Sequence, residues 1–312
     1  MQILMNRLIK KNKHLAKWAK RNHISVFRVY HKEIPEYPLT VDWVDGNVVA
    51  WWHERTRDDT EEKMSAYIAD ITQQLITAFS ISPDRLFLKK RGIQKGTEKY
   101  QRLDQQQKVI TIEENGLKFE INLSDYLDIG LFLDHRHHRQ AIRNLSQGKR
   151  VLNLFAYTGS FTCYAIAGGA KETTTVDMSP VYLHWTERNL ELNNFKSGPS
   201  HHLISEDCLQ FLEKETHQYD IIICDPPTFS NSKRMKQSSF AIERDYPDLI
   251  SQCERILAPS GLLLFSTNAK GFKLDPEILP KNLTITEKTT PHTSEDFKTC
   301  LPHQCWYLTK MK

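Results

Sequence analysis

"RVLNLFAYTGSFTCYAIAGGAKETTTVD", residues 150–177, contains a strand, a helix and a second strand in immediate succession. The outer pieces are rich in aliphatic and β-branched residues, and a helix is expected between them near residues 160–168. Two parallel strands need such a crossover connection, whereas two antiparallel strands do not. The stretch therefore predicts an α/β fold built on a parallel sheet.

The same alternation continues toward the carboxyl end of the chain. Further strands are expected at "SHHLIS", "YDIIICD" and "GLLLFST", with helices near residues 180–194, 207–215 and 240–257. Two late β-rich pieces, "NLTITEK" and "QCWYLTK", suit an antiparallel edge of the sheet. We therefore expect a doubly wound, Rossmann-like sheet of seven strands within residues 126–312.

The first 125 residues follow a different pattern. The expected elements are a helix over residues 1–21, a strand at "SVFRVY", a hairpin turning at Asp45-Gly46, a helix over residues 59–79, a strand at "RLFLKK" and a hairpin turning at Asn115-Gly116. The stretch "RGIQKGTEKYQRLDQQQ" lacks apolar periodicity and is expected to be a loop. We interpret residues 22–125 as a smaller α+β domain that follows the first helix.

The composition excludes several classes of protein. With 312 residues, 39% hydrophobic and 26% charged, the chain is typical of a soluble protein of two domains. No apolar run approaches the roughly 20 residues that span a bilayer, and the first segment lacks the apolar core of a signal peptide. A cytoplasmic location without membrane contact is expected. The six cysteines form no CxxC pair, which predicts reduced thiols and no metal site.

The positive charge is concentrated at the amino-terminal end. The first 32 residues contain no acid but nine basic residues, namely Arg7, Lys10, Lys11, Lys13, Lys17, Lys20, Arg21, Arg28 and Lys32. Apolar residues recur there at roughly helical spacing, at Leu4, Leu8, Leu15 and Trp18, so a helix with one docked face and one basic face is expected. A polyanionic partner would explain this asymmetry, and a merely solvated helix face is the alternative.

Polar residues follow the first two strands of the expected sheet, where ligands bind in doubly wound folds. Asn153 closes the first strand, and Thr158-Gly159-Ser160 opens a helix whose free N–H groups can receive a carboxylate. The GxGxxG pattern is absent, which disfavours a dinucleotide. Asp177 ends the second strand, where an acid can accept both hydrogen bonds of a ribose diol. Capping of the next helix is the alternative role, although Ser179 suits it better.

The third and fourth strand ends are also acidic. Asp207 is placed either to accept from an adenine amino group or to cap its own helix. The fourth end reads "DPPTFSNSKR", residues 225–234. Pro226 and Pro227 fix two backbone φ angles and rigidify the turn that carries Asp225.

With these motifs the segment from residue 134 to residue 310 resembles class I S-adenosylmethionine-dependent methyltransferases. The pieces "YLDIGLFLDHR", "VLNLFAYTGSFT", "TTTVDMS" and above all "DPPTFSNSKRM" resemble the guanine-N7 methyltransferase half of the bifunctional 23S ribosomal RNA large-subunit methyltransferases. The similarity extends to "NRLIKKNKHLAKWA" near the start of the chain. The family's usual second half, an N2-guanine methyltransferase with an RNA-binding module, is absent from this sequence. Either the protein stands alone, or it is one half of a longer gene product, and the partner half can be separate or fused.

The resemblance implies S-adenosylmethionine as cofactor and 23S ribosomal RNA as substrate. It also implies a set of cofactor-binding residues, namely Asp134, Arg136, Asn153, Tyr157, Thr158, Gly159, Ser160, Asp177, Met178, Asp207, Cys208 and Asp225. Asp225, Pro226, Pro227 and Phe229 would form the catalytic motif. Residues 22–125 would then bind RNA. The residues expected to contact RNA are Lys10, Lys11, Lys17, Lys90, Arg91, Asn231, Lys233 and Arg234.

The motif also bears on the atom that is methylated. Amino-methylating relatives carry NPPY, whereas this chain has Thr228 in the position of the aromatic residue and Phe229 one residue later. Guanine N7 carries no proton, so its methylation needs orientation and charge stabilisation rather than a base. Cytosine-C5 methylation would instead need a nucleophilic cysteine, for which Cys224, Cys300 and Cys305 are the candidates and look strand-bound. A catalytically silent RNA-binding assembly protein is the remaining alternative.

Overall fold

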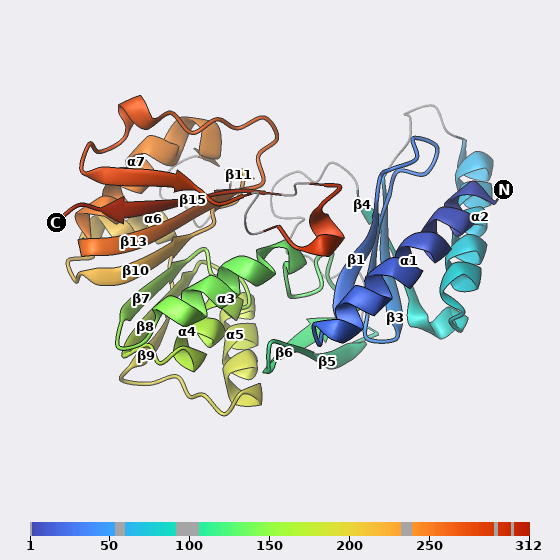
Figure 1. Ribbon diagram of the computed structural model, residues 1–312, viewed down its shortest axis with the longest axis horizontal. Coiled ribbons are helices and arrows are strands. Elements are labelled where there is room, and N and C mark those ends of the chain that lie inside the picture. Colours follow the sequence, from blue (N-terminus) through green and yellow to red (C-terminus); the bar gives the residue numbers. More distant parts are fainter. Residues whose placement is uncertain (1, 54–59, 92–105, 232–238, 290–292, 301–302) are drawn as a thin grey trace. The chain divides into compact units, whose positions relative to one another are not determined.

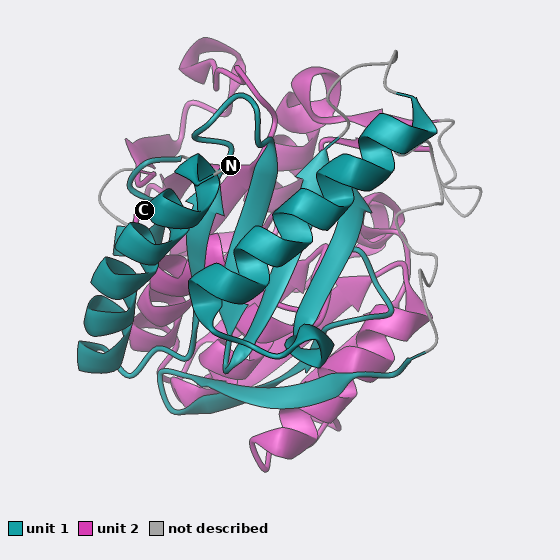
Figure 2. Cartoon of the chain, turned by 90° about the vertical axis from the view of Figure 1, so that its right-hand side faces the viewer, with its two compact units in different colours: residues 1–129, 295–300 teal, residues 130–294, 301–312 magenta. Residues whose placement is uncertain are grey.

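The computed structural model describes residues 2–53, 60–91, 106–231, 239–289, 293–300 and 303–312 (Figure 1). The chain divides into two compact units, which Figure 2 shows in different colours. Unit 1 comprises Met1–Ile129 and Glu295–Cys300, and unit 2 comprises Gly130–Ser294 and Leu301–Lys312. Each unit has its own sheet and its own hydrophobic core.

Unit 1 contains a four-stranded sheet with the order β1-β2-β3-β4. Its strands are β1 (Val26–His31), β2 (Leu39–Val44), β3 (Asn47–His53) and β4 (Leu86–Arg91). The hairpin predicted at Asp45-Gly46 is confirmed, since Val44 pairs with Asn47 across the turn. β3 and β4 are parallel, and helix α2 (Glu61–Phe79) lies between them in the chain. The hydroxyl of Thr60 caps α2 by accepting from the N–H of Lys63.

Helix α1 (Ile3–Arg21) docks one face on the rest of unit 1. Leu4, Leu8 and Leu15 are buried in the same cluster as Ile71 and Leu75 of α2. Burying a leucine side chain stabilises the fold by about 1.5–3 kcal/mol, so these residues fix the helix in place. The docked face predicted from apolar spacing is therefore confirmed.

The other described elements of unit 1 are a hairpin and two short turns. β5 (Val109–Glu114) and β6 (Leu117–Asn122) pair in antiparallel fashion, which confirms the hairpin predicted at Asn115-Gly116. The turns are the 3₁₀ helices η1 (Pro83–Arg85) and η6 (Glu295–Phe297). Asp296 of η6 accepts a hydrogen bond from the N–H of Arg28 at 3.1 Å. A late segment of the chain thus belongs to the first unit.

Unit 2 contains the seven-stranded sheet that the sequence predicts. Its order is β14-β15-β13-β10-β7-β8-β9, and β15 is antiparallel to both of its neighbours. The strands are β7 (Arg150–Leu154), β8 (Glu172–Asp177), β9 (His201–Ser205), β10 (Tyr219–Cys224), β13 (Leu257–Thr267), β14 (Leu283–Glu287) and β15 (Gln304–Lys310). The order changes direction between β7 and β10, which is the switch point at which doubly wound sheets bind ligands.

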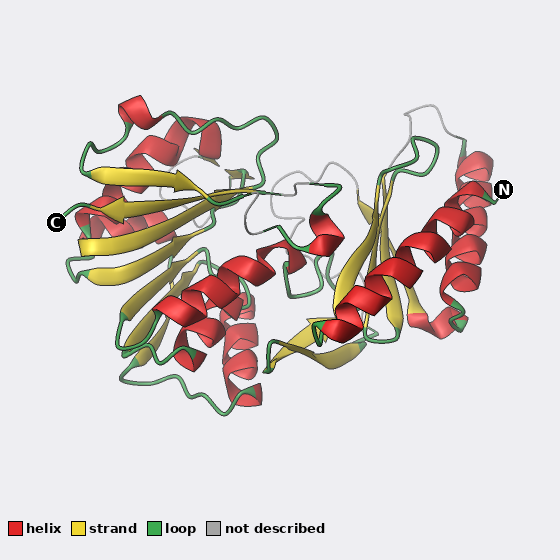
Figure 3. Cartoon of the chain, viewed as in Figure 1, coloured by secondary structure: helices red, strands yellow, loops and turns green. Residues whose placement is uncertain are grey.

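Within the described residues of unit 2, five helices cover the two faces of this sheet (Figure 3). They are α3 (Arg136–Leu145), α4 (Ser160–Ala167), α5 (Pro180–Leu192), α6 (Cys208–Lys214) and α7 (Ile242–Arg255). Ile223 of β10 packs in one cluster with α3 and α4, and its neighbour Ile222 packs in another with α6 and α7. Successive strand residues point to opposite faces, so β10 is buried on both sides.

Several local features differ from the sequence-based expectations. Helix α3 and the short antiparallel pair β11 (Phe229–Ser230) and β12 (Phe240–Ala241) were not predicted, and neither were the 3₁₀ turns η3 (Leu133–His135) and η4 (Pro276–Ile278). Ser179 precedes α5, but its side chain makes no capping hydrogen bond. Cys300 lies in no strand. Within the described part of the chain, no helix is long and apolar enough to cross a membrane.

Candidate functional site

The turn between β7 and α4 is held in a strained, closely packed conformation. Tyr157 has φ 52° and Gly159 has φ 70°, in the left-handed region that few residues adopt at low cost. The hydroxyl of Thr158 donates to the carbonyl of Gly130 at 2.6 Å, and Asn189 donates to the carbonyl of Thr158 at 2.9 Å. The turn is therefore fixed on both sides. Gly159 directly precedes α4, whose first N–H groups have no partner within the helix.

Asp177 ends β8 beside this turn. One carboxylate oxygen accepts from the N–H of Tyr157 at 2.9 Å, and the other accepts from the N–H of Ser179 at 2.8 Å. Each oxygen keeps a further lone pair for a ligand. Burial raises the pKa of Asp177 to about 6, although the two N–H groups oppose this shift. Asp177 is thus a partly desolvated acceptor suited to two hydroxyl donors.

The end of β9 brings Asp207 and Cys208 close to β7 and β8. Asp207 caps α6 by accepting from the N–H of Leu209 at 3.0 Å, and burial raises the pKa of Asp207. The thiol of Cys208 accepts from the N–H of Phe155 at 3.1 Å and is 2% exposed. Of the two roles weighed for Asp207, the capping role is present. The side chain of Cys208 contacts the neighbouring strands rather than an open site.

Three further residues expected at the site differ in their exposure. Asn153 is buried within the sheet and donates to the hydroxyl of Thr162 at 3.0 Å, and Thr162 in turn contacts the hydroxyl of Thr175 at 2.8 Å. Asn153 therefore ties β7 to α4 and β8. Ser160, the first residue of α4, and Met178, which follows β8, are both partly exposed.

Asp225 follows β10 at the switch point, and both of its oxygens are held. The hydroxyl of Ser266 in β13 donates to one oxygen at 2.7 Å, and Nε2 of His135 lies 3.3 Å from the other. Pro226 is buried and Pro227 is partly buried. The hydroxyl of Thr228 donates to Asn268, just after β13, at 2.6 Å. The "DPPT" turn is thus anchored to the end of β13 as well as stiffened by its prolines.

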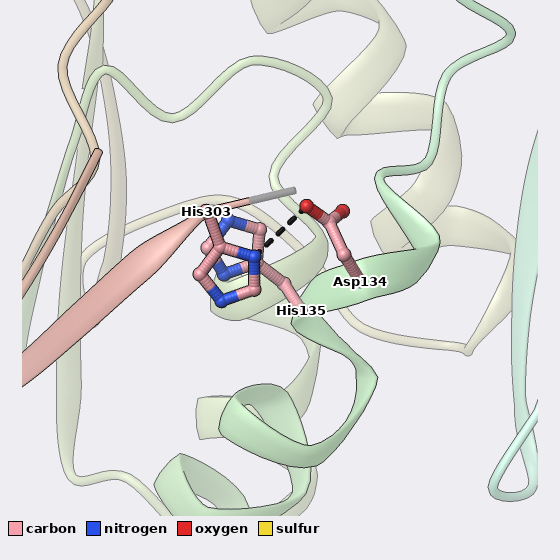
Figure 4. A group of neighbouring side chains, drawn as sticks. All are labelled: Asp134, His135 and His303. Carbon is pink, nitrogen blue, oxygen red and sulfur yellow. Dashed lines mark hydrogen bonds and ion pairs between the residues drawn. The ribbon is translucent and has the colours of Figure 1, made fainter. Parts of the chain in front are cut away.

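Asp134, His135 and His303 form a cluster next to Asp225 (Figure 4). Nδ1 of His303 lies 2.9 Å from the carboxylate of Asp134, and the rings of His135 and His303 are stacked with centroids 4.1 Å apart. Arg136 begins α3 and is buried. Each of the three residues in Figure 4 offers a potential metal ligand atom within 4.8 Å of the others.

The stacking of the two rings opposes metal binding by this cluster. An imidazole binds a metal at about 2 Å through a lone pair that lies in the plane of the ring. The planes of His135 and His303 are only 18° from parallel, so an ion in the plane of one ring lies well outside the plane of the other. We therefore interpret the cluster as two imidazole–carboxylate pairs rather than as a metal centre.

The family model for S-adenosylmethionine-dependent methyltransferases matches residues 28–299 of the chain. The chain belongs to this family. The methyltransferase is 44% identical over 308 residues to the ribosomal RNA large subunit methyltransferase K/L of Hahella chejuensis, and 42% identical to that of Vibrio cholerae. These matches cover 98% and 97% of the chain but 42% and 43% of the relatives, so the chain spans about two fifths of their length.

Solved structures show the same fold in more distant proteins. The methyltransferase matches SMU.776, a methyltransferase in complex with SAH, with a TM-score of 0.71, 23% identity and coverage of 98% of this chain and 81% of the other. A SAM-dependent methyltransferase from Streptococcus mutans gives a TM-score of 0.75 at 22% identity, with coverage of 98% and 80%. The two-unit fold of the methyltransferase is thus shared almost from end to end.

The residues of the methyltransferase fit the cofactor of the family. S-adenosylmethionine supplies an electrophilic methyl group, a carboxylate, an ammonium and a ribose diol. The first N–H groups of α4 suit the carboxylate, and the spare lone pairs of Asp177 suit the diol.

The residues expected to contact RNA differ in how accessible they are. Lys10 and Lys17 are exposed on α1, whereas Lys11 and Arg7 both pair with Glu33. Lys90 lies over the ring of Trp52 at 5.3 Å, and Arg91 pairs with Asp128 at 3.2 Å. Phe229 is 49% exposed and Asn231 is also exposed. Lys233 and Arg234 lie outside the described residues.

Sequence reasoning missed four residues of the site, namely His135, Ser266, Asn268 and His303. Ser266 and Asn268 lie at the end of β13, and His303 directly precedes β15. No acidic residue marks these positions in the sequence. His135 stands inside "LDHR", between two residues that were selected. The usable signal was the carboxyl end of β13, which lies next to β10 in the sheet.

Proposed function

We propose that this methyltransferase transfers a methyl group from S-adenosylmethionine to guanine N7 in 23S ribosomal RNA. The observation that carries the proposal is the identity of 42–44% over nearly the whole chain to ribosomal RNA large subunit methyltransferases K/L. The partly exposed carboxylate of Asp225 at the switch point supplies a site for the reaction.

In this proposal the cofactor spans the ends of β7, β8 and β9. The turn of Tyr157, Thr158, Gly159 and Ser160 receives the methionine portion through backbone N–H groups, and Asp177 accepts from the ribose diol. Met178 and the backbone around Asp207 contact the adenine. This arrangement directs the methyl group toward the "DPPT" turn at the neighbouring strand end.

The chemistry at that turn needs no general base. Methyl transfer is an in-line displacement, so the acceptor atom must be held about 3–3.5 Å from the methyl group. Guanine N7 has a free lone pair, and its methylated product is cationic. Asp225, ionised and fixed by two partners, lowers the energy of the developing positive charge. Phe229 is exposed and offers a surface on which the base can stack.

The cysteines do not support the cytosine-C5 alternative. Cys224 and Cys305 are fully buried, and burial raises the pKa of each thiol well above its ordinary value. Such thiols stay protonated at neutral pH and are poor nucleophiles. Cys300 is partly exposed and lies in no strand, so the case against the cytosine-C5 reaction rests on Cys224 and Cys305.

The decisive experiment is to incubate the chain with deproteinised 23S ribosomal RNA and labelled cofactor, and then to identify the modified nucleoside by mass spectrometry. We expect 7-methylguanosine. 5-Methylcytosine, or labelled cofactor that binds without any transfer to RNA, would overturn the proposal in favour of the cytosine-C5 reaction or of a silent RNA-binding protein. RNA with a pre-formed 7-methylguanosine at the mapped position is the matched negative control.

The basic face of α1 gives a separate prediction about RNA. Replacing the exposed residues Lys10, Lys13, Lys17 and Lys20 with glutamine removes up to four phosphate contacts. The slope of log K against log salt should then decrease by about 0.7 per lost contact with single-stranded RNA. Lys11→Gln should lower the slope by less than the substitution of an exposed lysine, because Lys11 already pairs with Glu33. Filter binding at several salt concentrations measures the slope. An unchanged slope would show that the basic face of α1 is merely solvated and does not contact RNA.

A further inference from the structure

Four buried or half-buried side chains from three distant segments meet at the first residue of the "DPPT" turn. Asp134 and His135 come from η3, Asp225 follows β10, and His303 directly precedes β15. They form two imidazole–carboxylate pairs, His135 with Asp225 and His303 with Asp134. The stacked rings join the pairs (Figure 4). The first of these pairs lies directly at the switch point of the sheet.

Exposure separates the roles of His135 and Asp225. The side chain of Asp225 is 29% exposed, whereas that of His135 is 5% exposed. The ring of His135 is enclosed by Phe161 at 5.6 Å and by His303 at 4.1 Å. A substrate can therefore reach Asp225 but not His135. Any effect of His135 on the reaction must pass through the carboxylate.

The charges around His135 and Asp225 favour a protonated imidazole and an ionised carboxylate. Burial alone would lower the pKa of His135, but the carboxylates of Asp225 and Asp134 outweigh burial, and its pKa lies above the ordinary value. Burial alone would raise the pKa of Asp225, but His135, Ser266 and His303 hold that pKa below its ordinary value. The titratable and charged groups that face His135 are Asp225, Asp134, Arg139, His138 and His303.

We propose that His135 is a positioning residue that keeps the carboxylate of Asp225 ionised and turned toward the base that receives the methyl group. This inference rests on the proposed function, in which Asp225 faces the acceptor. Held by Ser266 on one oxygen and by His135 on the other, the 29% exposed carboxylate keeps further lone pairs that can accept from a ligand. It presents a fixed negative charge where the cationic product forms, with no reorganisation during the reaction.

The stack with His303 gives His135 its orientation. His303 is itself held by Asp134, so the ring of His135 lies between a fixed imidazole and the edge-on ring of Phe161. Asp134 therefore lies three contacts away from the carboxylate of Asp225, through His303 and His135. This chain of contacts supplies a physical role for the "LDH" segment, in which Asp134 was expected to bind the cofactor.

The test uses two substitutions at His135 in the full chain. His135→Phe keeps a ring for the stack but removes the donor to Asp225, so kcat for RNA methylation should fall about 10- to 100-fold. KM for RNA and Kd for S-adenosylhomocysteine should stay within about threefold of wild type. His135→Gln keeps a neutral donor and should recover kcat to within about tenfold of wild type. His184→Phe, at an exposed histidine of α5, is the matched control and should behave as wild type.

A double-mutant cycle shows whether His135 acts through Asp225. In the Asp225→Asn background, adding His135→Phe should change kcat by less than about threefold, because no carboxylate remains to be held. The wild-type kcat should also decrease as pH rises through the raised pKa of His135, and His135→Gln should abolish this decrease since glutamine does not titrate. If the role of His135 were purely structural, His135→Phe would lower kcat by the same factor with and without Asp225→Asn. The pH dependence of kcat would also be the same in the wild type and in His135→Gln.

Full additivity of the two substitutions, or equal losses for the phenylalanine and glutamine variants, would overturn the inference. Variants that fail to fold are recognised by circular dichroism, and His135→Leu, which also lacks a donor, then replaces His135→Phe in the cycle. The identity of the methylated nucleoside is measured in the same reactions. A product other than 7-methylguanosine would refute the proposed function while leaving the coupling between His135 and Asp225 measurable.

Discussion

At pH 6, binding of S-adenosylhomocysteine to the wild-type chain should release about half a proton, and at pH 8 it should release none from Asp177. In the free protein burial raises the pKa of Asp177 to about 6, so the carboxyl is half protonated at that pH. Two ribose hydroxyl donors favour the charged form and lower the pKa. Binding therefore expels the proton, and affinity should weaken as pH falls below 6.

Calorimetry in buffers with different ionisation enthalpies measures the released proton. Asp177→Asn should remove the pH dependence and weaken binding at pH 8 by about 10- to 100-fold, since a charged acceptor typically contributes about 1.5–3 kcal/mol. Burial also raises the pKa of Asp207. Because Asp207 is present in both the wild type and the Asp177→Asn variant, any proton that it releases cancels in the comparison. Equal proton release by the variant and the wild type would remove Asp177 from the cofactor site.

The same pKa shift has an effect of opposite sign on stability. A carboxyl with a raised pKa in the folded state holds a proton that the unfolded chain releases between pH 6 and pH 3.8. The contribution of Asp177 to the free energy of unfolding therefore increases as pH falls through this window, by an amount on the order of 1–3 kcal/mol. At neutral pH the ionised carboxyl costs stability, and this cost is offset when cofactor binds.

The alternation of strands and helices was predictable because each element carries its own local pattern. Strand β10, for example, contains the continuous apolar run of residues 221–224, which is typical of a strand that is buried on both faces of a sheet. The rule that parallel strands present their carboxyl ends at one edge then predicted that Asp177 and Asp225 lie at the same edge of the sheet, as the parallel pairing of β8, β7 and β10 shows. Local pattern and topology together were sufficient for the seven-stranded sheet, although not for α3 or for the pair β11 and β12.

The contacts that hold Asp225 in place could not be predicted in this way. The pair of His135 and Asp225 joins residues 90 positions apart, and the stack of His135 on His303 joins residues still more distant in sequence. No periodicity encodes such contacts, because they depend on how α3 packs on the sheet and where β15 lies within it. The contact of Cys208 could not be predicted either, since its thiol accepts from the N–H of Phe155. The expected contact of Cys208 with the cofactor stays a prediction.

The substitution with the largest expected effect on the stability of the protein is at Gly159, because of its backbone geometry. An alanine there would adopt φ 70° and would place its Cβ inside van der Waals contact of Cγ2 of Thr186 and 2.7 Å from its Oγ1. Thr186 cannot move away, because it is fully buried and its hydroxyl donates to the carbonyls of Tyr157 and Tyr182. The left-handed backbone costs about 1 kcal/mol and the overpacking about 1–3 kcal/mol more.

Gly159→Ala should therefore lower the free energy of unfolding by about 2–4 kcal/mol. It should also weaken S-adenosylhomocysteine binding at least tenfold, since it displaces the turn that we propose to receive the methionine portion. Gly148→Ala is the matched control, because Gly148 has almost the same φ, 71°, but no heavy atom of the described residues lies within 4 Å of the position that its Cβ would occupy. It should lose only about 1 kcal/mol and should bind the cofactor normally. Urea unfolding and calorimetry on both variants separate backbone strain from packing. Equal stability of the two variants, or wild-type affinity in Gly159→Ala, would show that the turn between β7 and α4 tolerates a side chain and that close packing at Gly159 does not shape the cofactor site.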